Sequence, residues 1–266
     1  MTARPGQAKS SEWHAQWSLF EDDERFLFEE WIRPFTIAGF RGQSALEVGC
    51  GGGQHTCYVA EVAQSVTAVD LNTVEIARER TRRFSNVELV EADIASLDLG
   101  RTFDVVFCVG VIHHTDDPDR TFEGLYRHCR PGGTVIVWTY SAEGNALMRF
   151  IVEPLRKYVL RHLPRRVVYG FSSLLTAALY PAVHTIYRIE ALRFLPYFEY
   201  FRNFRRLSFD RNRLNIFDKL NAPQTRFTTA TTCRRWLDPR RFDPASLSIR
   251  RYAGVSYSLV ARRREG

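Results

Sequence analysis

The sequence predicts an α/β protein whose sheet is mostly parallel and covered by helices on both faces. Three observations support this fold class. Apolar, strand-like segments alternate with helix-like segments between residues 44 and 140. The first apolar strand ends in an acidic residue and opens into a glycine-rich loop at residues 49–53. The next strand ends at Asp70, where folds of this kind hold a carboxylate that accepts hydrogen bonds from a ribose diol.

The alternation sets the order of the elements. We expect strands near residues 44–49, 65–70, 87–92, 104–109 and 134–140, and helices near 54–63, 73–84 and 119–129. Apolar residues at helical spacing predict one or two helices over residues 11–35. After Pro223, a helix at 228–237 and strands at 246–252 and 257–263 would complete the sheet.

The glycine-rich loop is the first candidate for a binding site. Glycines at positions 49, 51 and 53 allow positive φ angles and let a ligand approach the backbone closely. Such a loop alone is a weak indication of a nucleotide site. Cys50 within it is interpreted as a small side chain that the loop requires, and not as a redox group.

Taken with four later motifs, this loop resembles the class I S-adenosylmethionine-dependent methyltransferases. The matching motifs occur in the family's order: residues 47–53 (EVGCGGG), 69–70 (VD), 91–94 (EADI), 103–107 (FDVVF) with 110–114 (GVIHH), and 130–133 (RPGG). The resemblance implies a seven-stranded, mostly parallel, doubly wound sheet. It also implies an N-terminal helical cap (1–40), a cofactor-binding core (41–140), a helical lid (141–222) and a closing helix and strand pair (223–266).

The resemblance implies S-adenosylmethionine as the cofactor. Asp70 would bind the ribose and Asp93 the adenine amino group, although Asp93 could instead cap a turn. Glu47 would support the loop or the methionine amino group, and His55 would touch the cofactor or cap the following helix. The full set of expected cofactor-binding residues is Glu47, Gly49, Cys50, Gly51, Gly53, His55, Asp70, Leu71, Asp93, Ile94 and Val109.

Methyl transfer from a sulfonium requires a positioned acceptor, exclusion of water and sometimes removal of a proton. His113 and His114 close the fourth strand, where they would face the methyl group, and one of them is the candidate general base because imidazole titrates near working pH, with His114 preferred over His113. Alternatively, both imidazoles only pack or bond to the backbone. Tyr140, at the end of the fifth strand, could orient the acceptor. No ligand spacing for a metal is found.

The composition, with 45% apolar and 25% charged residues, is that of an ordinary globular protein. Five scattered cysteines without paired spacing predict reduced thiols. No pattern of a secretory signal is recognised, so we expect a cytoplasmic protein.

The positive charge is concentrated in the predicted lid. Residues 141–221 hold fourteen Lys and Arg against six Asp and Glu, a net charge of +8, whereas the whole chain carries +7. Two apolar helical stretches, near 147–160 and 167–187, are expected to be broken by Pro164 and Pro181. The second is as long as a membrane span, but its polar residues favour a buried or interfacial helix. An aromatic and basic run follows at 194–206.

These features predict a small or lipid-linked acceptor, partly apolar and anionic, methylated on oxygen or carbon. They also predict that this cytoplasmic protein contacts the membrane surface peripherally through residues 141–222. One alternative is an RNA-modifying methyltransferase, because aromatic and basic residues also bind nucleic acid. Against it, residues 110–113 replace the motif of amino-methylating enzymes. The other alternative is a non-catalytic protein that binds the cofactor. The sequence does not determine the oligomeric state.

Overall fold

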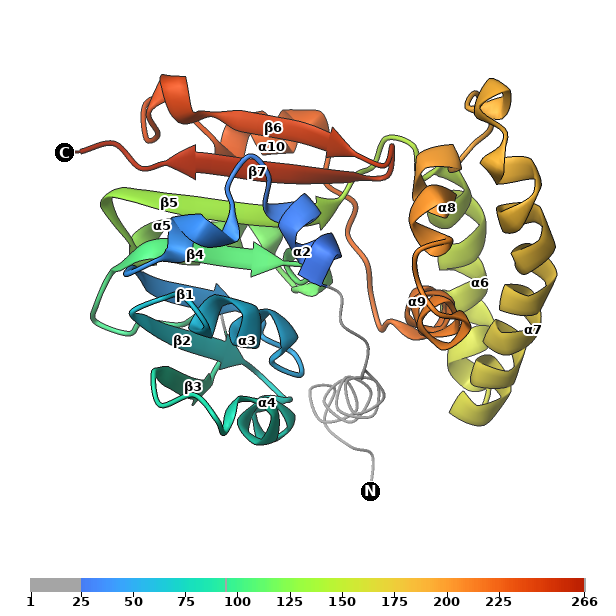
Figure 1. The fold of residues 1–266 in the computed structure, drawn as a ribbon, viewed down its shortest axis with the longest axis horizontal. Coiled ribbons are helices and arrows are strands. Elements are labelled where there is room, and N and C mark those ends of the chain that lie inside the picture. The colour runs from blue at the N-terminus through green and yellow to red at the C-terminus, as the bar shows by residue number, and fades with distance from the viewer. Residues whose placement is uncertain (1–24, 94, 266) are drawn as a thin grey trace. The chain divides into compact units, whose positions relative to one another are not determined.

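A seven-stranded sheet forms the centre of the computed structural model, which describes residues 25–93 and 95–265. The strand order is β3-β2-β1-β4-β5-β7-β6 (Figure 1). Strands β1 to β5 pair in parallel, and β7 runs against its neighbours β5 and β6. The bounds are β1 Ser44–Val48, β2 Ser65–Asp70, β3 Val87–Glu91, β4 Phe103–Val109, β5 Cys129–Tyr140, β6 Ser248–Tyr252 and β7 Ser256–Arg262. The predicted fold class is confirmed.

The described residues form two compact units. Of the described residues, unit 1 comprises 25–93, 95–140, 228–250 and 257–265, and unit 2 comprises 141–227 with 251–256. The helices of unit 1 are α2 Arg25–Ile32, α3 Gln54–Ala60, α4 Val74–Thr81, α5 Pro118–His128 and α10 Ala230–Trp236, with 3₁₀ turns η1 Ile37–Phe40, η2 Ile112–His114 and η7 Pro244–Ser246. Of the one or two helices predicted over residues 11–35, the structure shows α2, which ends at Ile32 and is followed by a turn at 33–35, and residues 11–24 lie outside the described residues.

The core of unit 1 consists of two layers, one on each face of the sheet. Leu46 and Val106 belong to a cluster with Phe122 of α5 and Trp236 of α10. Ala45 points to the opposite face of the sheet and belongs to a second cluster, which includes residues of α2 and α3. Because successive side chains of a strand point to opposite faces, helices must cover both faces of this sheet.

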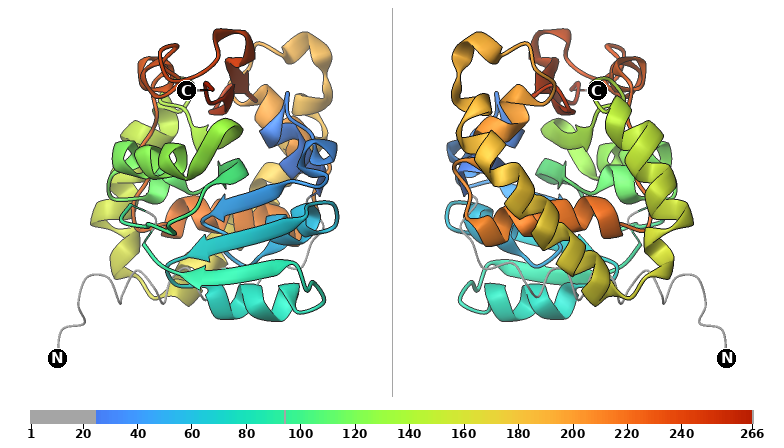
Figure 2. Two further views of the ribbon diagram at one scale, coloured as in Figure 1. Left: turned by 90° about the vertical axis from the view of Figure 1, so that its left-hand side faces the viewer. Right: turned by 90° about the vertical axis from the view of Figure 1, so that its right-hand side faces the viewer.

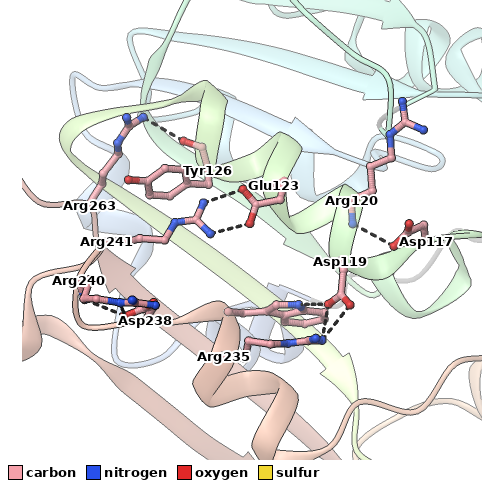
Figure 3. Close-up of polar contacts among 11 residues, drawn as sticks. Asp117, Asp119, Arg120, Glu123, Tyr126, Arg235, Asp238, Arg240, Arg241 and Arg263 are labelled. Carbon is pink, nitrogen blue, oxygen red and sulfur yellow. Dashed lines mark hydrogen bonds and ion pairs between the residues drawn. The ribbon is translucent and has the colours of Figure 1, made fainter.

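Polar contacts join α10 and the loop after it to α5 (Figure 3). Asp119 accepts hydrogen bonds from the indole nitrogen of Trp236, at 2.6 Å, and from Arg235, at 2.7 Å. The Arg241 guanidinium pairs with both carboxylate oxygens of Glu123, at 2.5 and 2.8 Å, and lies 3.7 Å from the centroid of the Tyr126 ring. Bidentate pairing fixes the geometry of both partners, so the C-terminal part of unit 1 is held in register with α5.

Unit 2 is helical. Its elements are the π-helical turn η3 Met148–Val152, α6 Glu153–Tyr158, α7 Arg165–His184, α8 Phe198–Phe204 and α9 Phe209–Asn221, with 3₁₀ turns η4 Leu160–His162, η5 Ile186–Arg188 and η6 Glu190–Leu192. Pro164 precedes α7 as predicted, but the prediction that Pro181 ends the helix is wrong, because α7 continues to His184. By length and composition α7 could cross a membrane; one such helix is weak evidence for a span, and 22% of its apolar stretch is buried within the protein.

The aromatic and basic run at 194–206 mostly packs inside unit 2. Phe198 and Phe204 are buried, and Phe204 joins a small core with residues of α7 and α9. Arg202 forms an ion pair with Glu199, and Arg205 donates to the carbonyl oxygen of Tyr187. Several of these side chains therefore stabilise the unit itself, whereas Phe194 at the start of the run is exposed.

Candidate cofactor and acceptor site

The predicted site residues of unit 1 converge at one edge of the sheet. β1, β2, β4 and β5 are parallel, so their carboxyl ends point the same way. The register pairs Val48 with Val69 and Val109 with Trp138, which brings the last residues of the four strands level with one another. Ligands of open α/β folds bind outside the carboxyl ends of the strands. The glycine loop, Asp70, the histidine pair and Tyr140 all follow or end these strands.

Backbone geometry explains the glycines of the loop. Gly49, Gly51 and Gly53 have φ angles of 81°, 52° and 79°, which disfavour other residues. A Cβ on Gly49 would also lie 2.5 Å from both γ-methyl groups of Val111, which is too close. The loop thus needs glycine at position 49 for two separate reasons.

Four of the five N–H groups at residues 49–53 donate within the protein. The N–H groups of Gly49 and Cys50 both donate to the carbonyl oxygen of Val69, and that of Gly53 donates to the carbonyl oxygen of Cys50. The Gly51 N–H donates to the carboxylate of Asp70 at 3.0 Å. A loop that binds phosphate leaves these donors to the ligand. This loop therefore suits a ligand without phosphate.

Asp70 is fixed by two backbone donors. Its Oδ2 accepts from Gly51 and its Oδ1 accepts from the N–H of Asn72, also at 3.0 Å. Thr73 adds a hydrogen bond from its hydroxyl to the carbonyl oxygen of Gly51 at 2.7 Å, which ties the same two loops together. Next to Asp70, the Leu71 side chain is 50% exposed, as expected of a residue that would cover a bound ligand.

Glu47 is a buried acid beneath the loop. The hydroxyl of Thr56 donates to its Oε2 at 2.5 Å, and Nδ1 of His55 lies 3.8 Å from its Oε1. Burial, with a smaller contribution from the charge of Asp70, raises the pKa of Glu47 to about 8 although the Thr56 hydrogen bond acts against this. At neutral pH this carboxyl group is mostly protonated. Support of the loop through Thr56 agrees with the structural role predicted for it.

His55 lies in the first turn of α3. The residue before α3 is Gly53, which has no side chain that could cap this end. The His55 ring stacks on Phe28 of α2 with 4.7 Å between ring centroids, and Trp31 approaches it edge-on at 6.0 Å. These contacts join α2 to the start of α3, and the choice between a cofactor contact and a cap stays a prediction.

The remaining predicted cofactor residues differ in exposure. Asp93 is exposed and its Oδ1 accepts from the N–H of Ala95 at 3.0 Å, so the expected turn contact is present. Ile94 lies outside the described residues. Val109 and Cys50 are buried in the core, and burial raises the pKa of the Cys50 thiol well above its usual range. A ligand contact through Cys50 would therefore use its backbone. The binding roles of all these residues stay predictions.

The histidine pair belongs to η2 and lies among aromatic rings. His113 is buried, with its ring centroid 4.2 Å from that of His114 and 4.4 Å from that of Tyr140. His114 is half-buried and 6.5 Å from Tyr140. The structure thus brings together the three residues predicted to meet the acceptor. His114 is the more accessible imidazole, and its role as general base stays a prediction.

Trp138 was missed by the sequence analysis. Its ring lies 4.8 Å from that of Trp31, 5.2 Å from that of Tyr140 and 6.0 Å from that of His113. It is only 7% exposed, and its indole N–H has no acceptor among the described residues. A buried donor without a partner is costly, and such groups are common where a ligand binds. The signal available in the sequence was its position two residues before Tyr140, on the same face of the strand.

No group of three metal-ligating side chains is found within residues 25–93 and 95–265.

Comparison with known proteins agrees with this geometry. Residues 46–137 match the family model described as a methyltransferase domain. This segment holds the glycine loop, Asp70 and the histidine pair on a sheet of order 3-2-1-4-5-7-6. Residues 46–137 form a class I S-adenosylmethionine-dependent methyltransferase domain, and S-adenosylmethionine is the cofactor of this domain.

Curated relatives match over part of the chain. A ubiquinone biosynthesis O-methyltransferase of Pseudomonas putida is 30% identical over 133 residues, which cover 48% of this chain and 56% of the relative. The mitochondrial ubiquinone biosynthesis O-methyltransferase of Schizosaccharomyces pombe is 30% identical over 131 residues, 47% of each chain. The chain thus spans about half the length of these relatives.

Two solved structures share the fold over nearly the whole chain. The N-methyltransferase NodS of Bradyrhizobium japonicum, bound to S-adenosylhomocysteine, has a TM-score of 0.52 and 12% identity, covering 96% of this chain and 98% of NodS. The magnesium protoporphyrin IX methyltransferase of Synechocystis has a TM-score of 0.51 and 13% identity, covering 99% and 89%. At this identity the likeness concerns the fold alone.

Proposed function

We propose that this protein transfers a methyl group from S-adenosylmethionine to a hydroxyl oxygen of a small, largely apolar acceptor. The observation that carries the proposal is the cluster of His113, His114, Trp138 and Tyr140 at the edge of the sheet that also holds the glycine loop. The rings offer an apolar surface for an acceptor, and an imidazole can remove the proton that a hydroxyl group loses on methylation.

Two further points support this choice. The loop's N–H groups are engaged within the protein, which suits a cofactor without phosphate better than a dinucleotide. The relatives from Pseudomonas and Schizosaccharomyces are named O-methyltransferases, which favours oxygen over carbon or nitrogen as the methylated atom.

Each residue then has a distinct role. Asp70 accepts hydrogen bonds from the ribose, and Glu47 supports the loop from below through Thr56. His114 takes the proton of the acceptor, and His113 and Tyr140 orient the acceptor. The sulfonium already activates the methyl group, so the protein supplies alignment and a water-poor surface rather than a covalent intermediate.

The test begins with binding of S-adenosylhomocysteine by calorimetry, beside NAD as a control. We expect micromolar affinity, on the order of −7 to −8 kcal/mol, for the former only. A screen with methyl-labelled cofactor then compares hydroxylated aromatic compounds that carry apolar substituents with total tRNA. Transfer to the hydroxyl compounds supports the proposal. Transfer to RNA alone, or binding of cofactor without transfer to any class of acceptor, contradicts it.

A further inference from the structure

The exposed apolar side chains are concentrated in unit 2. Among the described residues, fifteen large apolar side chains are exposed, and thirteen of them belong to residues 141–227. Folded proteins ordinarily leave such side chains scattered singly, and a gathered set marks an interaction surface.

The helix α7 carries apolar residues on its packed side, among them Val168 and Val183, and also on its exposed side. Tyr169 packs edge-on against Phe217 of α9, 5.4 Å between ring centroids, and α7 crosses in front of α9 in the right-hand view of Figure 2. The hydroxyl groups of Ser172 and Thr176 lie on the packed side. Each donates to the backbone carbonyl oxygen one turn earlier, at 2.8 Å for Ser172 and 2.7 Å for Thr176. A stripe of exposed apolar residues runs along the other side of α7 at intervals of three or four positions. Its members are Val167, Phe171, Leu174, Ala178 and Pro181.

A second exposed stripe precedes it along the continuous helical segment formed by η3 and α6. Its members are again three or four residues apart, or adjacent on the same side. They are Leu147, Phe150, Ile151, Leu155 and Tyr158, between 39% and 69% exposed. We call these two stripes together the α6–α7 apolar face.

Exposed basic side chains lie beside both stripes. The Arg149 guanidinium is 5.2 Å from the ring of Phe150, and the Lys157 ammonium is 5.3 Å from the ring of Tyr158. Arg161 and Arg166 are exposed at the turn between the two helices. Within residues 144–193 there are eight Lys and Arg but two Asp and Glu, and one of these acids, Glu153, is paired with Arg156. Long basic side chains can lie along apolar surface and extend their charge to a polar boundary.

We propose that the α6–α7 apolar face binds the surface of an anionic lipid bilayer, with its helices lying along the membrane. Apolar side chains would enter the acyl region while the basic groups meet the headgroups. A second copy of this face is a poorer occupant, because the two positive surfaces would repel each other. A crossing helix fits less well, because one side of α7 is already packed against α9. The proposal does not depend on the methyl acceptor.

The first experiment is flotation of the full chain with vesicles of phosphatidylcholine alone, or with about a third phosphatidylglycerol. We expect binding to the anionic vesicles that weakens with salt. The double variant Phe171→Ser/Leu174→Ser and the charge variant Arg161→Ser/Arg166→Ser should each bind at least about tenfold more weakly. Their matched controls in unit 1, Ile249→Ser and Arg78→Ser/Arg82→Ser, should bind like the unchanged protein.

A second experiment reports on insertion directly. All five cysteines are buried, so a single exposed cysteine can be labelled selectively with an environment-sensitive fluorophore. A label at Leu174→Cys should shift to shorter wavelength with anionic vesicles, whereas a label at Arg82→Cys should not. Thermal unfolding and S-adenosylhomocysteine binding establish that each variant is folded.

Three outcomes overturn the proposal. One is equal flotation of the Phe171→Ser/Leu174→Ser variant, and another is equal binding to neutral and anionic vesicles. The third is a dimer in light scattering that this variant converts to a monomer, without vesicle binding by the unchanged protein. That result would assign the face to self-association.

Discussion

The N–H of Gly51 donates to the carboxylate of Asp70 at 3.0 Å, and this bond joins the loop after β1 to the end of β2. Asp70 also accepts from Asn72, so its carboxylate has a fixed orientation before any ligand binds. A binding group held in place in this way loses little entropy when the ligand arrives.

Replacement of Asp70 by Ala should weaken S-adenosylhomocysteine binding by about 1.5–3 kcal/mol, because it removes a charged acceptor and releases the Gly51 N–H. Calorimetry measures the change. Glu75→Gln, an exposed carboxylate on the following helix, is the control and should leave affinity unchanged. Equal affinities of the Asp70→Ala variant and the unchanged protein would contradict a role of Asp70 in binding the cofactor.

Glu47 should make the protein less stable as pH rises. Its pKa is raised from the ordinary 4.5 to about 8 in the folded state. Below pH 4.5 the carboxyl is neutral in both states, and between 4.5 and about 8 the unfolded state loses its proton first, so the stabilising contribution declines over that window. His55 and Asp70 are the titratable groups that face it.

Glu47→Gln should abolish this decline, because an amide does not ionise. Relative to the unchanged protein, we expect a gain in unfolding free energy of about 4 kcal/mol near pH 8, and little difference near pH 4. Urea unfolding across this range measures it, with the exposed Glu79→Gln as control. If the free energy of unfolding changes with pH in the same way in the Glu47→Gln variant and the unchanged protein, the raised pKa of Glu47 is refuted.

His114→Ala should lower turnover by about 10²-fold or more with the identified acceptor and leave S-adenosylhomocysteine affinity nearly unchanged. His113→Ala opens a buried cavity, so its unfolding must be followed in parallel, and His162→Ala in unit 2 is the control. If neither His113→Ala nor His114→Ala alters turnover, the mechanism is positioning alone.

The two buried indole N–H groups should respond oppositely to substitution. Trp236 donates to Asp119 at 2.6 Å, so Trp236→Phe loses a charged hydrogen bond and should destabilise the protein by about 1–3 kcal/mol. Trp138→Phe removes an N–H that has no acceptor among the described residues and should be close to neutral or stabilising. Thermal unfolding of both variants tests this. A comparable loss of stability in both would show that Trp138 has a structural partner.

The Trp138 N–H should be used by the acceptor. With the identified acceptor, Trp138→Phe is expected to raise KM about tenfold while kcat and cofactor affinity change little, since the ring remains to pack against Trp31. An unchanged KM would remove Trp138 from the acceptor site.

The sequence by itself determined the α/β order, the glycine loop, Asp70 and the histidine pair. These depend on local information: the period of the strands, backbone angles that only glycine adopts readily, and residues that follow a strand directly. For the same reason, helix and strand bounds in unit 1 agree with the expected ranges to within a few residues, except that β5 begins earlier, at Cys129.

Only the tertiary structure decided what depends on contacts between distant segments. The pairing of Trp31 with Trp138 joins α2 to β5, over a hundred residues apart in the chain. The raised pKa of Glu47 comes from burial under a loop that is itself held by Asp70. The outward apolar side of α7 depends on which side meets α9. Periodicity locates a helix and its two faces, but the neighbour that packs against one face decides which is buried.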